Sequence, residues 1–542
     1  MPIDFDLNLD FLAELNKVSL CNVQPGLFPT ANRQATFSNA SQSRSESCIA
    51  INPRNPRNMV GASKKFIDPH IYLFRLGVIY TFDGGNSWQE ATLPMRSGWD
   101  GMTDPTVAFD DFGNCFLVGE PLRFNRDKVG TSQDLTGLGM VVYRSTDGGA
   151  TWQEPIQLTT DTTDDKQWVI CDNNRFSPHY GNVYVVWAAS SPLRFARSTD
   201  HGQTWTGKAG EPAGSTLVSM QAFAPELAIS PDGTLHLFWH NSGGSEVKYL
   251  RSTNGGSSFA PLQTVVVGME SLSGNLPEVD QWPHFENGKF RVLTLVTSCT
   301  VGKAVLVAWA DMREGRSRIY YRRSPDGGAT WEGPAAGQPL LPNVSYGDSH
   351  CFHPQIVATE TGVVGCAFYV FGKEFGYYLI RVQLAGSWDK GATFPTFVTV
   401  TDKSWDPLVN APAVHGNGAV DFIGEYFGLD AGEESFALLW TDTRTGVQEL
   451  FFDEVQTKKV SCPHIPEIVG QIFGGVASDG GGFVIVGGKI IKIPPWSPLR
   501  EVYEVLGAFE AVGDVQGDEV REMRVAALKT AVRQLERLLE QL

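Results

Sequence analysis

The sequence lacks the features that mark several common classes of protein. No run of about 18 apolar residues occurs in its 542 residues, so no transmembrane helix is expected. Lys and Arg number only 43 against 60 Asp and Glu, and the net charge of −17 argues against nucleic acid or an anionic membrane as a partner. Residues 1–10 are acidic and contain neither the basic nor the apolar stretch of a secretory signal. We therefore expect a cytoplasmic protein, or one exported by a non-classical route.

Cysteine is also scarce, and its pattern indicates no disulfide framework. The eight Cys show no metal-ligand or disulfide spacing, and several lie in apolar runs such as 113–118 and 364–368. Small buried thiols in a reducing compartment are the favoured interpretation. A Gly-x-Ser-x-Gly elbow and a P-loop are missing. The acidic segment 161–165 lacks the Gly and the last Glu of an EF-hand loop, so neither a metal nor another cofactor is predicted.

The chain is rich in turn-forming and aromatic residues, and it repeats one short phrase six times. The 57 Gly, 31 Pro and 14 Trp suit many short strands joined by turns. The phrase is Ser/Thr-x-Asp-x-Gly-x-Ser/Thr-Trp/Phe, with Asn replacing Asp once. Its central residues are Asp83, Asp147, Asp200, Asn254, Asp326 and Asp389. A phrase that recurs every 53 to 72 residues indicates one supersecondary unit per copy.

The residues of the phrase have the chemistry of a tight hairpin turn. The Asp accepts hydrogen bonds from nearby backbone N–H groups, and Gly supplies positive φ angles. The aromatic residue packs the turn onto the next strand. These side chains are fully occupied in building the turn, so we predict a structural role and no catalytic one.

Short strands surround each phrase in the same order, which predicts an all-β propeller of four-stranded antiparallel blades. A seventh unit, at about residues 421–452, has no such turn. Seven blades are predicted, with six as the alternative. A closed ring must cover its edge strands, so we expect residues 33–40 to supply the last strand of the seventh blade.

The pattern changes after residue 460, and four regions are predicted. Residues 1–32 form an N-terminal extension and residues 33–460 the propeller. Residues 461–497 read as a small β-hairpin, and residues 498–542 as a helical tail with an amphipathic final helix. The tail either folds back on the propeller or pairs with another chain.

The six turns resemble those of the Asp-box (bacterial neuraminidase repeat) family of the sialidase superfamily. The resemblance extends over residues 45–455. The segments 46–58, 104–110 and 440–444 are similar to a bacterial, sialidase-like, seven-bladed subgroup. The resemblance implies a propeller whose chemistry lies away from the Asp turns. Propellers as a class host many activities.

The order of the strands in a blade also places the candidate site away from the Asp turns. In a four-stranded blade, the start of the first strand and the end of the second meet at the mouth, opposite the Asp turn. Charged residues expected at this mouth fall into two groups. Candidate catalytic residues are Glu46, Asp104, Glu425 and Tyr426. Candidate ligand-binding residues are Arg44, Asp165, Arg123, Arg313, His353 and Arg444. Such a mouth could bind a carboxylated sugar, or it could be a lattice of structural ion pairs, which the repeated Asp-x-Arg of Arg313 and Arg444 favours.

A working sialidase is expected to have a Phe/Tyr-Arg-Ile-Pro motif and three arginines on the substrate carboxylate. This chain has no such motif, and neither Arg33 nor Arg44 has its context. Glu425 and Tyr426 are adjacent, so on a strand they would face opposite sides. Sialidase catalysis is therefore not carried over. Glu46 and Asp104 could still hydrolyse another glycoside if their carboxyl groups lay about 5–10 Å apart.

Two hypotheses follow. The first is a glycan-directed propeller that binds or hydrolyses a glycan at the mouth opposite the Asp turns; whether it is an enzyme stays open. The second is a non-catalytic interaction scaffold that docks to a protein partner, or to itself, through residues 498–542.

Overall fold

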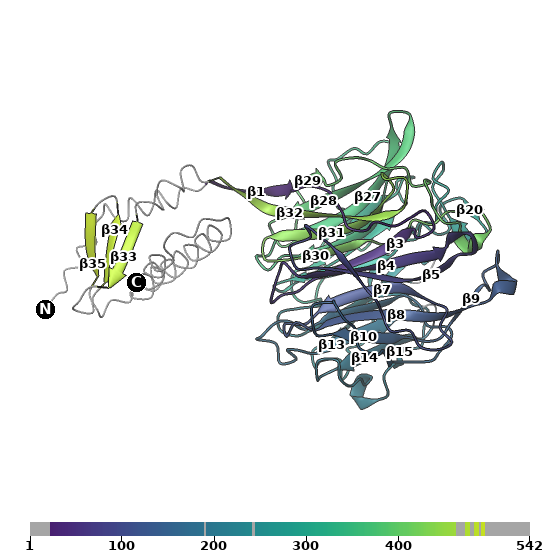
Figure 1. Ribbon diagram of the computed structural model, residues 1–542, viewed down its shortest axis with the longest axis horizontal. Helices are drawn as coiled ribbons and strands as arrows, with labels where there is room; N and C mark the ends of the chain where they lie inside the picture. Colours follow the sequence, from purple (N-terminus) through teal and green to yellow (C-terminus); the bar gives the residue numbers. More distant parts are fainter. Residues whose placement is uncertain are drawn as a thin grey trace. The chain divides into compact units, whose positions relative to one another are not determined.

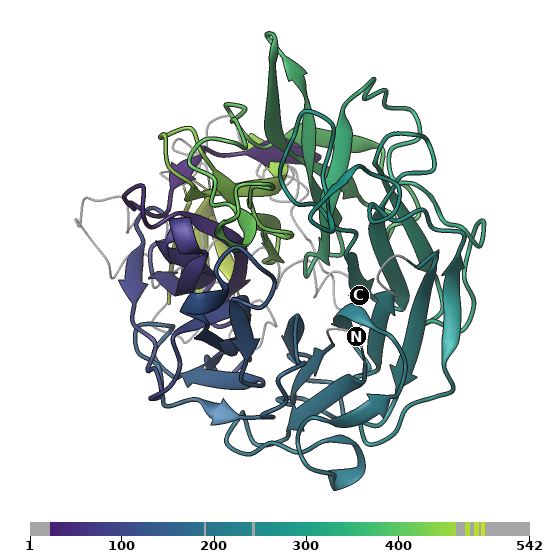
Figure 2. The ribbon, with the colours of Figure 1, turned by 90° about the vertical axis from the view of Figure 1, so that its right-hand side faces the viewer.

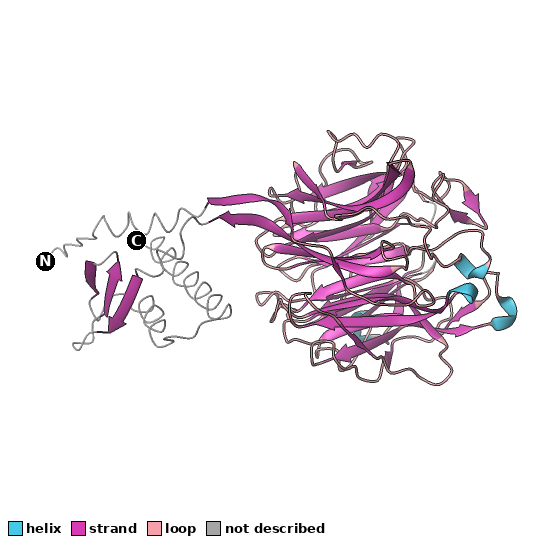
Figure 3. Ribbon diagram, turned by 45° about the horizontal axis from the view of Figure 1, so that its top comes forward, coloured by secondary structure: helices cyan, strands magenta, loops and turns pink. Residues whose placement is uncertain are grey.

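The computed structural model describes residues 22–188, 191–240 and 244–461 and three short strands beyond them. Strands dominate these residues, and four single-turn 3₁₀ helices are the only helices among them (Figure 3). They are η1 (Pro69–Ile71), η2 (Arg126–Lys128), η3 (Lys208–Gly210) and η4 (Val414–Gly416). The predicted all-β class is thereby confirmed. No helix in this part of the chain is long and apolar enough to cross a membrane.

Residues Gly26–Lys458 form one compact unit built from antiparallel sheets. Seven sheets of four or five strands recur along the described residues of this unit, each starting with an inner strand. The first strands are β3 (Arg44–Ile51), β7 (Gly101–Phe109), β12 (Gln167–Cys171), β16 (Phe223–Ile229), β22 (Val296–Val301), β26 (His350–Ala358) and β30 (Gly428–Ala431). Each first strand contacts the next, and β30 contacts β3, so the sheets close into a ring (Figure 2).

The outer strands of each sheet follow in chain order (Figure 1). Second strands are β4 (Met59–Asp68), β8 (Cys115–Phe124), β13 (Val183–Trp187), β17 (Leu235–His240), β23 (Ala304–Asp311), β27 (Val364–Glu374) and β31 (Ser435–Asp442). Third strands are β5 (Leu73–Thr81), β10 (Val141–Ser145), β14 (Leu193–Ser198), β18 (Glu246–Ser252), β24 (Arg318–Ser324), β28 (Tyr377–Ser387) and β32 (Glu449–Ser461). Fourth strands are β6 (Gln89–Ala91), β11 (Ile156–Gln157), β15 (Ser215–Val218), β19 (Gln263–Val267), β25 (Gln338–Pro339) and β29 (Thr396–Thr399).

The seventh sheet takes its outer strand from the start of the chain. Both β1 (Asn22–Pro29) and β2 (Arg33–Gln34) pair with β32. β2 lies within the predicted segment 33–40, whereas the longer β1 lies upstream of it. Two further additions are β9 (Leu135–Gly137), which pairs with β8, and the small sheet of β20 (Glu278–Val279) and β21 (Trp282–Pro283).

The other unit includes a three-stranded antiparallel sheet of β33 (Ile472–Val476), β34 (Gly482–Val486) and β35 (Lys489–Ile493). The hairpin predicted in segment 461–497 accordingly has a third strand. The helical tail predicted for residues 498–542 and most of the N-terminal extension lie outside the described residues.

The register of the strands separates two ends of the ring. Ser45 pairs with Lys64 and Ile51 with Met59, so the start of β3 lies beside the end of β4. We call this end the mouth. The Asp turn after β5 lies at the other end, where the amide of Gly84 donates to the carbonyl of Arg57, between β3 and β4, at 2.9 Å.

The five turns built on Asp share the same side-chain hydrogen bonds, and in the fourth turn Nδ2 of Asn254 donates to Ser258 Oγ instead of accepting from it. In the first, Asp83 Oδ1 accepts from Thr81 Oγ1 at 2.7 Å and from the Ser87 amide at 2.9 Å. The copy at Asp326 is equivalent, and hydrogen bonds from the side chain and amide of Thr330 lower the pKa of Asp326 to about 2. These carboxylates are saturated with donors inside their own turns, which leaves them no capacity for a ligand.

Candidate functional site

Backbone strain recurs where the first strands begin. In β3, β7, β16 and β26 a register shift marks a bulge at this point. Left-handed backbone costs a non-glycine residue roughly 1–2 kcal/mol, and bulges of this kind re-aim side chains. The residues with positive φ at or just before the first strands are Glu46 (53°), Asp104 (52°), Lys166 (29°), Ala224 (44°), His353 (47°) and Gly424 (89°). Such strain is a reason to look for function at the mouth.

Glu46 and Asp104 are brought together there. The Oε2 atom of Glu46 lies 2.9 Å from Nζ of Lys64, on β4, and both side chains are almost completely buried. Asp104 lies within hydrogen-bonding reach of the carboxyl groups of Glu46 and Asp165. Three acidic groups therefore meet at one point, with a buried lysine beside them.

This contact separates the pKa values of the acids. Burial raises the pKa of Glu46 to about 8, and burial together with the charge of Asp104 raises that of Asp165 to about 7. Burial acts on Asp104 too, but Lys64, Lys166 and the two neighbouring carboxyls outweigh it and lower the pKa of Asp104. At neutral pH the cluster thus contains an ionised carboxylate held against a protonated one, as general acid–base pairs require.

Glu120, on β8, extends the acidic group. Carboxylate oxygens of Asp104, Glu120 and Asp165 all lie within 4.8 Å of one another, which is close enough to hold a hard cation such as Ca²⁺. Burial and the neighbouring Asp165 raise the pKa of Glu120 well above its usual value. Because Lys64 and Lys166 already lower the charge here, the geometry alone assigns no metal.

Arg291 is the residue that sequence reasoning missed. It lies in segment 277–293, an insertion before β22 that interrupts the repeat, so no repeat position points to it. Its Nε lies 2.6 Å from Oε1 of Glu425, and its guanidinium packs over the rings of Trp282 and Phe422, with Cζ 4.3 and 4.8 Å from their centroids. Within the described part of the chain, its two terminal nitrogens make no hydrogen bond. Stacking thus fixes a guanidinium whose outer edge is free.

Glu425 and Tyr426 both join the cluster, because the strand alternation expected for them does not apply. Glu425 lies at a bend, and β30 begins only at Gly428. The Tyr426 ring lies 3.7 Å below Nζ of Lys166, and burial raises the pKa of its hydroxyl well above the usual value. A protonated phenol of this kind is a poor nucleophile in this state.

His353 lies in β26 at the equivalent bulge and is 1% exposed. Neither ring nitrogen has a hydrogen-bond partner among the described residues. Burial lowers its pKa to about 3, so the imidazole is neutral. A buried ring with two unused nitrogens can donate to one ligand group and accept from another.

The remaining predicted residues lie outside this cluster. Arg44 pairs with Glu90 at 3.1 Å, and Arg123 is exposed on β8. Arg313 and Arg444 bind the carboxylates of Asp311 and Asp442, which also accept from Trp309 and Trp440. The role of these two arginines is therefore structural. Among the described residues of the cluster, one arginine and two lysines converge. A working sialidase is expected to have three arginines at this place.

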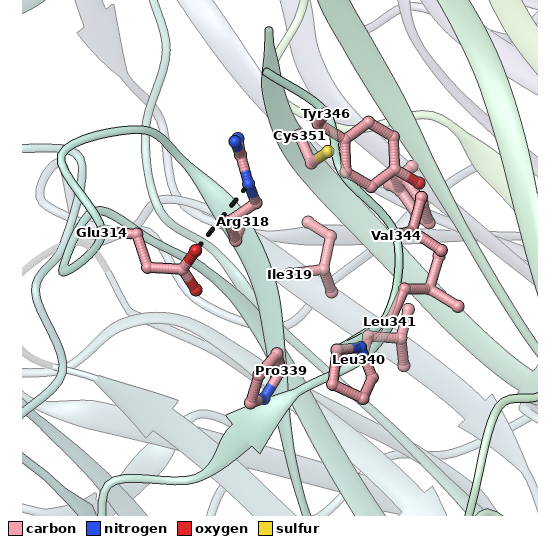
Figure 4. Close-up of a pocket in the computed structure, with 11 residues that line it drawn as sticks. Glu314, Arg318, Ile319, Pro339, Leu340, Leu341, Val344, Tyr346 and Cys351 are labelled. Carbon is pink, nitrogen blue, oxygen red and sulfur yellow. Dashed lines mark ion pairs between the residues drawn. The ribbon is translucent and has the colours of Figure 1, made fainter. Parts of the chain in front are cut away.

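A larger cleft lies elsewhere, between β24 and the segment leading to β26 (Figure 4). Its empty volume is about 420 Å³, partly open to solvent, and its walls are mainly apolar. Arg318 at its edge donates to the carbonyls of Ser349 and Gly347 at 2.6 and 2.9 Å. The one guanidinium there is committed to the backbone, so the cleft offers no comparable chemistry.

Comparison with known proteins supports the repeat. The family model described as BNR/Asp-box repeat matches residues 143–154, the second Asp turn. The predicted Asp-box resemblance is thus confirmed at this copy. No match was found among curated proteins.

Several solved structures align with this chain at low identity. A protein of unknown function from Dyadobacter fermentans aligns with a TM-score of 0.45 and 12% identity over 80% of this chain and 100% of that one. The leech intramolecular trans-sialidase aligns at 0.39 and 13% over 62% and 67% of the two chains. The NanB sialidase of Streptococcus pneumoniae aligns at 0.40 and 10% over 64% and 67%. At these identities and TM-scores the matches carry no argument about activity.

Proposed function

We propose that this Asp-box repeat protein is a seven-bladed propeller that binds an acidic glycan at the mouth. The observation that carries the proposal is Arg291, whose guanidinium is stacked between two rings and leaves its outer edge free. A planar guanidinium held in place binds a carboxylate or sulfate through two parallel hydrogen bonds. His353 supplies further polar contacts for sugar hydroxyls.

The neighbouring acids support a second step, hydrolysis of the bound glycoside. Glu46 carries a proton at neutral pH and can act as the general acid, while Asp104 is ionised and can act as base or nucleophile. The two carboxyl groups touch, whereas glycosidases hold theirs roughly 5 Å or more apart. Hydrolysis therefore requires the ligand to separate them on binding.

Binding and hydrolysis are tested together. The full chain is titrated calorimetrically with sialylated, uronate-containing, sulfated and neutral oligosaccharides. Acidic oligosaccharides should bind, and Arg291→Met should weaken them by at least about tenfold, the scale of one charge-assisted hydrogen bond. Arg123→Met is the matched control and should bind normally. Release of sugar by the wild type, together with its loss in both Glu46→Gln and Asp104→Asn, would establish hydrolysis. Binding without release of sugar would indicate a lectin.

The internal contacts of the cluster support a scaffold instead, because Lys64 is in contact with Glu46 and Arg291 is paired with Glu425 without a ligand. Absence of binding to every oligosaccharide would favour that alternative. Deletion of residues 498–542 should then abolish partner binding or self-association while the propeller stays folded.

A further inference from the structure

A second, smaller cavity lies in the centre of the ring, beside the acidic cluster. It is lined by Lys166, Trp168, Glu226, Gln355 and Tyr426, with apolar walls from Ala224, Pro225, Leu295 and Val296. These residues belong to the first strands of successive sheets or lie just before them. The space accommodates about one water molecule or one small ion.

Lys166 brings a positively charged group to this cavity. Its Nζ is buried and has no hydrogen-bond partner among the described residues. Nζ lies 3.7 Å from the centre of the Tyr426 ring, and its charge helps to lower the pKa of the nearby Asp104. The attraction between a cation and a ring offsets only part of the cost of burying an ammonium group without hydrogen bonds.

The other polar groups around the cavity are also able to donate. Oε1 of Glu226 accepts from the Ser298 amide at 2.6 Å and from Thr297 Oγ1 at 3.1 Å. Burial raises the pKa of Glu226 to about 8, so at neutral pH its second oxygen carries a proton. The Gln355 amide adds two N–H groups. An ammonium, a carboxylic acid and an amide thus meet around a space of ionic size.

We infer that this cavity binds a small monovalent inorganic anion of the halide class, held by the ammonium group of Lys166. The apolar walls favour a weakly hydrated ion over a multiply charged one. This site is separate from the glycan site proposed at Arg291 and does not depend on it. The anion would supply the hydrogen-bond acceptor that the Lys166 ammonium group lacks among the described residues.

The test uses the full chain in sodium gluconate, with sodium bromide or chloride replacing gluconate at constant ionic strength. Thermal unfolding and ³⁵Cl NMR line width are followed. Halide should raise the unfolding temperature saturably and broaden the chloride line. Lys166→Met should abolish both effects, while the exposed Lys303→Met should leave them intact.

A second variant keeps the inference falsifiable if Lys166→Met does not fold. Above its pKa, Glu226 becomes a carboxylate facing Lys166, with Cys299 the other titratable group near it. Halide affinity of the wild type should fall about fivefold from pH 8 to pH 9. Glu226→Gln should retain its affinity across that range. An unsaturable halide effect in the wild type, or equal pH dependence in both proteins, would overturn the inference.

Discussion

Oε2 of Glu46 lies 2.9 Å from Nζ of Lys64, and this buried contact joins the first two strands of the first sheet. The pair exists because the bulge at Glu46 turns its side chain from the alternation of β3 toward the neighbour strand, where Lys64 pairs with Ser45. Lys64 is enclosed by the rings of Phe74 and Phe422, 4.5 and 4.4 Å from Nζ. The ammonium group of Lys64 is thus held by the carboxyl group of Glu46 and by aromatic faces.

Loss of one partner should destabilise this pair strongly. Lys64→Met leaves the acidic cluster without its buried cation and should lower the free energy of unfolding by about 3–5 kcal/mol. Urea denaturation at pH 7 measures this. The neighbouring Lys65→Met is the control, because Lys65 pairs with the half-exposed Glu90 and should cost less than about 1 kcal/mol. Equal effects of the two substitutions would contradict the burial argument.

The raised pKa of Glu226 predicts how stability depends on pH. Its pKa is 4.5 when exposed and about 8 in the folded protein, mainly because of burial. The folded state therefore binds the proton more tightly. The contribution of this group to stability is complete below about pH 4.5 and is lost as the pH rises to about 8. Glu226→Gln should make the decline of unfolding free energy shallower over this window, measured by urea titrations at each pH. An unchanged dependence of the unfolding free energy on pH would contradict the raised pKa of Glu226.

The sequence predicted the repeated parts of this molecule and failed where the repeat is interrupted. Each Asp turn is local, so its residues alone specify the hairpin, and strand order then places Glu46 and Asp104 at the mouth. Arg291 could not be found in this way, since it belongs to an insertion whose path depends on distant contacts. Its amide donates to the carbonyl of Asp421 at 2.9 Å, far along the chain. The bulges were equally invisible, because Glu46 and His353 have no sequence feature that requires a positive φ.

Gly424 is required by the close approach of two sheets. A Cβ at this position would lie 2.5 Å from the Glu46 amide nitrogen, and φ is 89°. Gly446 has a φ of 88° and no atom within 4 Å of such a Cβ. Gly446→Ala should therefore cost only the left-handed backbone, about 1–2 kcal/mol. Gly424→Ala should cost more, because Glu46 must also move. Chemical denaturation compares the two variants, and equal losses would exclude the steric explanation.

The Asp turns should tolerate Asn but not Ala, and neither change should reach the mouth. Asn254 already occupies the Asp place in the fourth turn, where its Oδ1 accepts from the Ser258 amide at 2.9 Å. Asp326→Asn keeps this acceptor and should change stability little, whereas Asp326→Ala removes the acceptor for Thr330 and Ser324 and should cost about 1 kcal/mol per lost hydrogen bond. Thermal unfolding measures both. Oligosaccharide binding should match the wild type in each variant, because the turn lies at the end of the ring opposite Arg291; a binding defect in Asp326→Asn would place a ligand contact at the Asp turns.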